Sequence, residues 1–162
     1  IRFPSSTFEM PTSERYLLGP NLLIGLCGKE GKAVTWAMTV KDADCVLSRL
    51  TIAIVRSVIN SGAATELQRK SWHHALDATV SRMETGGATL VDLNETILDK
   101  FHEYRTYAPL DCTIPNKGVV PVAQDVRLLI TTADVMDLVF TEYDDVYMGQ
   151  LKKGTTVRVQ SL

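Results

Sequence analysis

The pattern of hydrophobic and polar positions changes period twice along the chain. Between Val34 and Val40, large apolar residues alternate with small or polar ones, the period of two that is typical of a strand with one face on a core. An apolar run over residues 21–26 and a glycine-containing segment over 28–32 precede this strand. Together they predict a β-hairpin closed by a glycine loop over residues 21–40.

From residue 42 onward the apolar positions fall at helical spacing. The first predicted helix begins at Asp42 or Asp44, either of which can cap its start, and stops at the Asn-Ser-Gly segment 60–62. A second helix is predicted over residues 65–85. Because a short connection joins them, the two helices are expected to form an antiparallel hairpin.

A third helix is predicted from Asp92, where Asp92-x-x-Glu95 resembles a capping box, up to Pro109, which cannot continue a helix. Beyond Pro109 the period returns to two, and β-branched residues are frequent to the end of the sequence. The segment 109–162 is therefore expected to form β-strands.

The expected fold class is α+β. Prolines and hydroxyl residues in the first twenty positions predict an extended arm over residues 1–20. A mixed region of hairpin and helices follows over 21–108, and a β region over 109–162. Because Ile1 rather than Met leads the sequence, we expect a processed or trimmed N-terminus.

Composition narrows the functional classes. The chain has 162 residues, of which 45% are hydrophobic and 22% charged, so it can bury a core. Seventeen basic and nineteen acidic residues give a net charge of -2, and the Lys and Arg residues are scattered. No electrostatic footprint for nucleic acid or anionic lipid is therefore expected. The longest uncharged run, 16–28, is too short to span a membrane directly.

Several residue groups could carry chemistry, and the structural interpretation is favoured for each. The segment 25–32 fails the phosphate-loop spacing and is expected to be a hairpin turn. His73 and His74 are adjacent, and adjacent helical residues point about 100° apart, so joint chelation of a metal ion is not expected. Asp144 and Asp145 with nearby Glu142 could bind a cation, although a solvated loop is favoured.

The remaining candidates are also weak. The three cysteines, Cys27, Cys45 and Cys112, lie far apart in the sequence, and we expect buried thiols rather than a metal site. His102 stands beside Glu103 on the third predicted helix, where a solvated position explains it. No sequence pattern places a histidine beside a nucleophile. No catalytic residue is therefore assigned.

Five segments of the last third occur in an order and spacing that match a known family. They are 117–121, 125–130, 132–136, 151–154 and 155–159. This stretch, residues 117–162, resembles the C-terminal cupredoxin-like domain of cytochrome c oxidase subunit II. The resemblance implies alternating strands that form part of a sandwich, completed by strands from a partner chain, because three or four strands leave unpaired edges.

The chain departs from that family at the copper site. The resemblance places the first copper ligand at Asp137, and the later Cys-x3-Cys-x3-His-x2-Met series has no counterpart in the sequence. An isolated carboxylate does not replace soft thiolate and imidazole ligands. We therefore expect no metal, catalytic or cofactor site in this chain, and the resemblance implies haem and copper in partner subunits.

The resemblance implies a non-catalytic structural subunit of a mitochondrial respiratory terminal oxidase. It places the chain at the intermembrane-space face of the inner membrane, among other protein subunits, without nucleic acid and without its own membrane span. Two alternatives remain open. One is a self-assembling virion, coat or cage protein, and the other is a small α+β enzyme with a pocket between the Trp36 hairpin and the helices.

Overall fold

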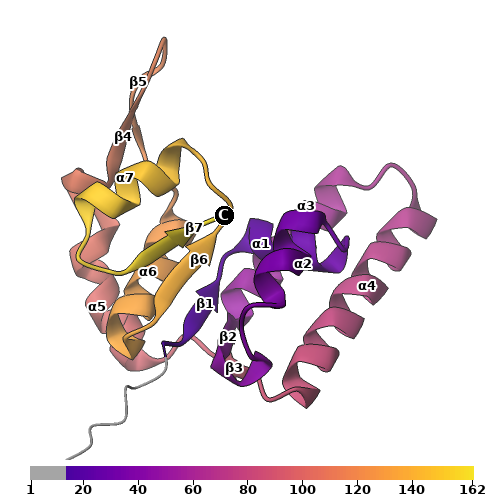
Figure 1. Ribbon diagram of the computed structural model, residues 1–162. Helices are drawn as coiled ribbons and strands as arrows, with labels where there is room; N and C mark the ends of the chain where they lie inside the picture. Colours follow the sequence, from indigo (N-terminus) through magenta and orange to yellow (C-terminus); the bar gives the residue numbers. More distant parts are fainter. Residues whose placement is uncertain (1–13) are drawn as a thin grey trace, which may run out of the picture.

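The computed structural model describes residues 14–162, and its centre is a five-stranded parallel sheet in the order β3-β2-β1-β6-β7 (Figure 1). Every neighbouring pair of strands in this sheet is parallel. The strands are β1 (Tyr16–Leu18), β2 (Cys45–Ser48), β3 (Thr89–Val91), β6 (Val139–Glu142) and β7 (Val159–Ser161). Each is three or four residues long, so the sheet is narrow along the strand direction.

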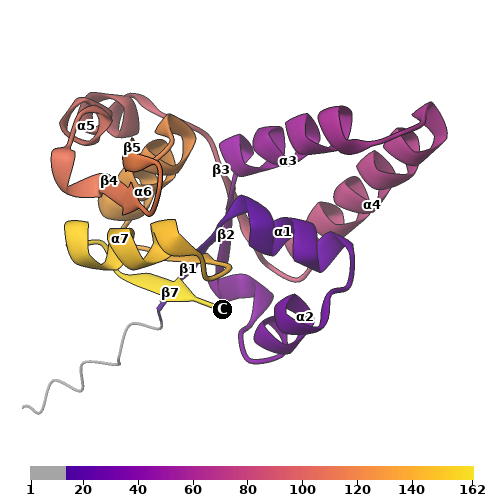
Figure 2. The ribbon, with the colours of Figure 1, turned by 90° about the horizontal axis from the view of Figure 1, so that it is seen from above.

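Helices cover both faces of the sheet, as Figures 1 and 2 show. They are α1 (Pro20–Cys27), α2 (Gly31–Ala37), α3 (Arg49–Gly62), α4 (Glu66–Thr85), α5 (Glu95–Arg105), α6 (Gln124–Met136) and α7 (Val146–Gly154), with 3-10 turns at Asp42–Asp44 and Ala108–Leu110. One core joins Leu17 of β1 to α6 and α7, and the other joins Leu18 to α1, α3 and α4. The inner strands β1, β2 and β6 are largely buried and mostly apolar, whereas the edge strands β3 and β7 are partly exposed.

The predicted α+β fold with a cupredoxin-like end is wrong, and the fold is α/β. Residues 124–136, which were expected to contribute strands, form α6. Val126, Leu128 and Ile130 do alternate, but the fully buried positions Leu129, Ile130 and Ala133 recur at helical spacing. A short apolar run fits both periods, and here the helical one prevails.

The hairpin predicted over residues 21–40 is also wrong, because this segment forms α1 and α2. The alternating residues Val34 and Met38 are 37% and 83% exposed, whereas Ala33 and Trp36 are buried. The helical spacing of three between Ala33 and Trp36, and not the alternation, therefore decides which residues face the core. Pro20 occupies the first turn of α1, where a backbone N–H is not needed.

The predicted arm over residues 1–20 is corrected where the structure describes it. Tyr16–Leu18 form β1 at the centre of the sheet, paired with β2 on one side and β6 on the other. Residues 1–13 lie outside the described residues. The three helices expected in the middle of the chain are present as α3, α4 and α5, although α3 starts at Arg49 because β2 precedes it.

A two-stranded antiparallel hairpin stands away from the sheet, at the top of Figure 1. Its strands are β4 (Asp111–Ile114) and β5 (Gly118–Pro121). Asn116 in the turn and Gly118 at the start of β5 have φ 67° and 73°, in the left-handed region that glycine and asparagine adopt most readily.

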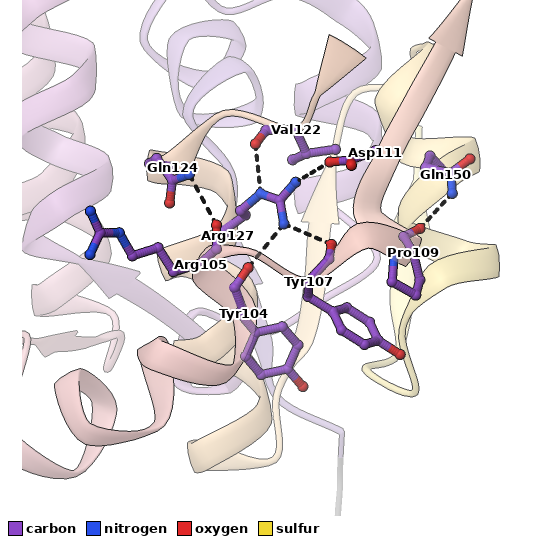
Figure 3. Close-up of polar contacts among 9 residues, drawn as sticks. All are labelled: Tyr104, Arg105, Tyr107, Pro109, Asp111, Val122, Gln124, Arg127 and Gln150. Carbon is purple, nitrogen blue, oxygen red and sulfur yellow. Dashed lines mark hydrogen bonds and ion pairs between the residues drawn. The ribbon is translucent and has the colours of Figure 1, made fainter. Parts of the chain in front are cut away.

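The base of this hairpin is held by Arg127 of α6, whose side chain is almost completely buried (Figure 3). Its Nε donates to the Val122 carbonyl at 2.8 Å, and its Nη1 donates to the carbonyls of Tyr104 and Tyr107 at 3.0 and 2.9 Å. Its Nη2 donates to Asp111 Oδ1 at 2.8 Å. One guanidinium thus joins the end of α5, the start of β4 and the residue after β5.

We expect Arg127→Met to lower the free energy of unfolding by about 3 kcal/mol, because it leaves three carbonyls and the Asp111 carboxylate without their donor. Urea unfolding monitored by circular dichroism measures this change. The control is Arg105→Met, which removes an exposed guanidinium from the same region and is expected to cost less than about 0.5 kcal/mol. Equal effects of the two substitutions would contradict the role given to Arg127.

Candidate functional site at the carboxyl edge of the sheet

The strand order reverses between β1 and β6, because β2 and β3 extend the sheet on one side and β6 and β7 on the other. In open parallel sheets, ligands bind beyond the carboxyl ends of the strands at such a reversal. Beyond β1 the chain enters Gly19 and α1, and beyond β6 it enters Tyr143. The edge formed by these residues is therefore the candidate functional site.

Glu142, the last residue of β6, provides the central polar group of this edge. The residue is 5% exposed. Its Oε2 accepts a hydrogen bond from the Asn21 backbone N–H at 3.0 Å, and its Oε1 accepts from the N–H groups of Leu22 and Tyr143, both at 2.8 Å. Asn21 and Leu22 lie in the first turn of α1, where backbone N–H groups have no acceptor within the helix. Glu142 therefore caps α1 from a different strand.

The electrostatics of Glu142 reflect two opposing effects. Burial raises the pKa of its carboxyl group, while the three backbone donors lower it, and burial prevails. Asp145 adds a smaller repulsive contribution that also raises the pKa. The carboxyl group is thus held in place by hydrogen bonds in a setting that resists its ionisation.

Gly19 makes room for this carboxyl group. At φ -75° its backbone is extended and suits any residue. A Cβ added there would collide with Oε2 and Cδ of Glu142 and would lie 2.9 Å from its Cβ. The side chain of Glu142, and not the backbone conformation, therefore requires glycine at this position.

Tyr143 covers the neighbouring part of α1. Its hydroxyl donates to Glu30 Oε2 at 2.6 Å, and a Cβ on Gly25 would collide with that hydroxyl. Burial and the neighbouring Glu30 carboxylate raise the pKa of Tyr143 to about 12. The tyrosine stays neutral at ordinary pH and acts as a donor to Glu30, linking β6 to the corner between α1 and α2.

The other buried polar side chains along the sheet are also satisfied internally. Ser48 Oγ accepts from the Leu50 N–H at 3.1 Å and caps α3, while Thr51 Oγ1 donates to the Leu18 carbonyl at 3.2 Å. Thr141 Oγ1 donates to the Val139 carbonyl at 3.2 Å. Within residues 14–162, every buried side-chain nitrogen and oxygen has a hydrogen-bond partner.

These residues do not fit a divalent cation. Mg²⁺ and Ca²⁺ bind through several oxygen ligands, usually including more than one carboxylate. The nearby carboxylate of Asp145 already caps α7, and both oxygens of Glu142 already accept N–H groups. In the part of the chain that the structure describes, no group of three or more His, Cys, Asp and Glu residues is placed to hold a metal ion.

The residues singled out from the sequence lie elsewhere. Asp137 ends α6 in the left-handed conformation at φ 53°, and its exposed carboxylate pairs with Arg158 at 3.2 Å. His73 contacts Arg56 and Asn60 between α3 and α4, and its neighbour His74 is exposed.

Glu142 and Asp145, which the sequence suggested as members of one acidic group, have separate roles in the structure. Glu142 is buried, whereas Asp145 caps α7 by accepting from the Met148 N–H at 2.9 Å. The thiols of Cys27, Cys45 and Cys112 are free. Burial raises the pKa of Cys45 to about 12, which leaves this thiol protonated.

The sequence did contain a signal for the edge that was missed. Two short apolar runs, 16–18 and 138–140, are each followed closely by polar or helix-starting residues. That pattern is typical of buried parallel strands whose carboxyl ends meet at one edge. The first run was assigned to the arm, so Gly19, Asn21 and Glu142 were not brought together.

A second feature is an apolar cleft of about 330 Å³ between α1, α3 and α4, whose arrangement Figure 2 shows. Val58 of α3 and Trp72 of α4, two residues of its lining, remain 48% and 44% exposed. Burial raises the pKa of the Cys27 thiol in its wall. The lining residues are Ile24, Cys27, Gly28, Val55, Val58, Ile59, Gly62, Trp72 and Ala75. We refer to this feature as the α1–α3–α4 cleft.

No protein-family model matches this chain, and no curated protein matches it. Solved structures do match. FitAcB from Neisseria gonorrhoeae is 18% identical with a TM-score of 0.64, and the match covers 90% of this chain and 96% of that one. VapBC2 from Rickettsia felis, bound to a DNA fragment from its promoter, is 14% identical with a TM-score of 0.67, covering 91% and 98%. A toxin–antitoxin complex from Klebsiella pneumoniae is 13% identical with a TM-score of 0.59, covering 90% and 96%.

These likenesses overturn the resemblance to cytochrome c oxidase subunit II. The expected roles as a respiratory structural subunit, a coat or cage protein, or an unspecified α+β enzyme are wrong as well, and so is the mitochondrial placement that rested on the resemblance. No helix within residues 14–162 is both long enough and apolar enough to cross a membrane. At these identities the likeness establishes the fold, and the chain has the PIN-domain fold shared by these structures.

Proposed function

We propose that this chain is the PIN-domain member of a two-protein complex and binds its partner protein through the α1–α3–α4 cleft. The observation that carries the proposal is the cleft itself. None of its nine lining residues bears a charged side chain, and it is open enough to leave Trp72 and Val58 partly exposed. Protein interfaces are commonly anchored by a few large apolar side chains that fill such pockets.

The size of the cleft limits what it accommodates. At about 330 Å³ it lies at the low end of ligand-binding pockets. That volume suits one or two large apolar side chains projecting from a helix or an extended segment. The partner segment is therefore expected to be amphipathic, with apolar side chains facing the cleft.

The first half of α4 supports a partner at this place. In this 20-residue helix the buried residues are Leu76 and Met83, both in the second half. The first half, residues 66–75, contains no buried residue, although Trp72 is apolar. Because helices in proteins gain most of their stability from packing an apolar face, a bound partner would supply contacts that the fold lacks here.

The comparisons support a protein partner in general terms. The neighbours include a toxin–antitoxin complex, so the fold occurs in assemblies of two proteins. Three of the neighbours are complexes bound to DNA. For this chain we propose a protein partner without direct nucleic-acid binding, since its net charge is -2 and its basic residues are scattered. We assign it no catalytic step, because the carboxyl edge uses its polar groups internally.

We expect Val58→Asp to weaken partner binding at least tenfold, because it places a charge against the apolar segment that enters the cleft. The partner is first recovered by native co-purification of the tagged chain from its own source and identified by mass spectrometry. The affinity of the purified pair is then measured by isothermal titration calorimetry.

The matched control is Leu98→Asp. Leu98 is also an exposed apolar residue, at 50%, but it lies on α5 and outside the cleft. This substitution is expected to leave the affinity unchanged. Binding that survives Val58→Asp and is lost in Leu98→Asp would move the interface to the other side of the sheet, and purification without any stoichiometric protein partner would reject the proposal.

A further inference from the structure

We infer that the carboxyl edge of this sheet is closed from within: the carboxyl group of Glu142 occupies the place that a ligand or a side chain at position 19 would take. This inference concerns the edge between β1 and β6 and does not depend on the proposed partner. Gly19 leaves the space that the carboxyl group of Glu142 fills, and together the two residues occupy the usual ligand site of an α/β sheet.

The backbone donors of α1 account for the closure. Gly19, at the helix start, has no side chain to cap the helix, and Pro20 has no N–H. The N–H groups of Asn21 and Leu22 both donate to Glu142. The N–H of Leu23 donates to the Gly19 carbonyl at 3.1 Å. Every donor of the first turn is thus engaged, and none is available to an external phosphate or carboxylate.

The same contacts disfavour a cation. A metal ion bound through both oxygens of Glu142 would compete with the three N–H groups that these oxygens accept. It would also approach the N-terminus of α1, which carries partial positive charge. The first turn of α1 therefore has no free donor for an anion, and the buried carboxyl group of Glu142 is already hydrogen-bonded at both oxygens.

Steric exclusion couples the two positions. A side chain at residue 19 and the carboxyl group of Glu142 cannot occupy the same space. The backbone of Gly19 nevertheless has the extended conformation of an ordinary N-cap residue, at φ -75° and ψ 163°. An aspartate side chain at this position would consequently supply a local cap if Glu142 were absent.

We expect Gly19→Asp to have opposite effects in two backgrounds. In the wild-type chain it lowers the urea midpoint of unfolding, because the new side chain collides with Glu142. In a Glu142→Ala chain the same substitution raises the midpoint, because the introduced carboxylate caps the freed N–H groups of α1. The four proteins are compared by urea unfolding under identical conditions.

Gly31→Asp is the matched control. Gly31 is the first residue of α2, and a Cβ added there meets nothing within 4 Å. Its effect is expected to be the same in both backgrounds. If Gly19→Asp is unfolded alone but folded together with Glu142→Ala, the coupling is also confirmed. The inference would be overturned if the shifts of Gly19→Asp and Glu142→Ala were additive. It would also be overturned if Gly19→Asp prevented folding in both the wild-type and the Glu142→Ala chain.

A metal titration tests whether the carboxyl edge of the sheet can bind a cation. We expect Mn²⁺, followed by its electron paramagnetic resonance signal, to show no saturable binding that depends on Glu142. The wild-type chain and Glu142→Gln should therefore give the same titration curve. One-to-one binding in the wild type that disappears in Glu142→Gln would show that the edge is an open cation site.

Discussion

The burial of β1 on every side is the constraint on which the rest of the fold depends. This three-residue strand pairs with β2 and β6, while Leu17 and Leu18 enter the two separate cores. Gly19 and Leu22, which follow this strand, are also buried, so the backbone N–H of Leu22 cannot rely on water for an acceptor. The start of α1 therefore needs an acceptor from the protein, and the neighbouring strand β6 provides it through Glu142.

The periodicity of apolar residues correctly predicts the helices of the middle of the chain. The helices α3, α4 and α5 are 11 to 20 residues long and expose one side, so their spacing is visible in the sequence. The strands of the sheet have only three or four residues, and the inner strands β1, β2 and β6 are largely buried on both faces, so they show no alternation. Their pairing depends on contacts between distant segments, which is why the sequence predicts an arm where Tyr16–Leu18 form a strand.

The error in the last third has a specific chemical origin. Residues 124–136 contain β-branched residues, including Thr131 and Thr132, that favour strands by propensity. In α6 their hydroxyl groups donate to the carbonyls of Arg127 and Leu128, one turn earlier, and so the helix accommodates them. The resemblance to subunit II depended on reading this segment as sheet, and it fails together with that assignment.

The candidate site was hidden because its two halves are more than a hundred residues apart. The sequence nevertheless shows that α1 starts with Gly19, which has no side chain to cap the helix, and Pro20, which has no N–H. A helix start without a local cap needs an acceptor from elsewhere in the protein. Glu142 is that acceptor, and both of its oxygens are engaged by backbone N–H groups. The other end of α1, at Ile24 and Cys27, lines the apolar cleft. Glu142 thus fixes the helix that shapes the cleft, which connects the closed edge to the surface proposed for binding.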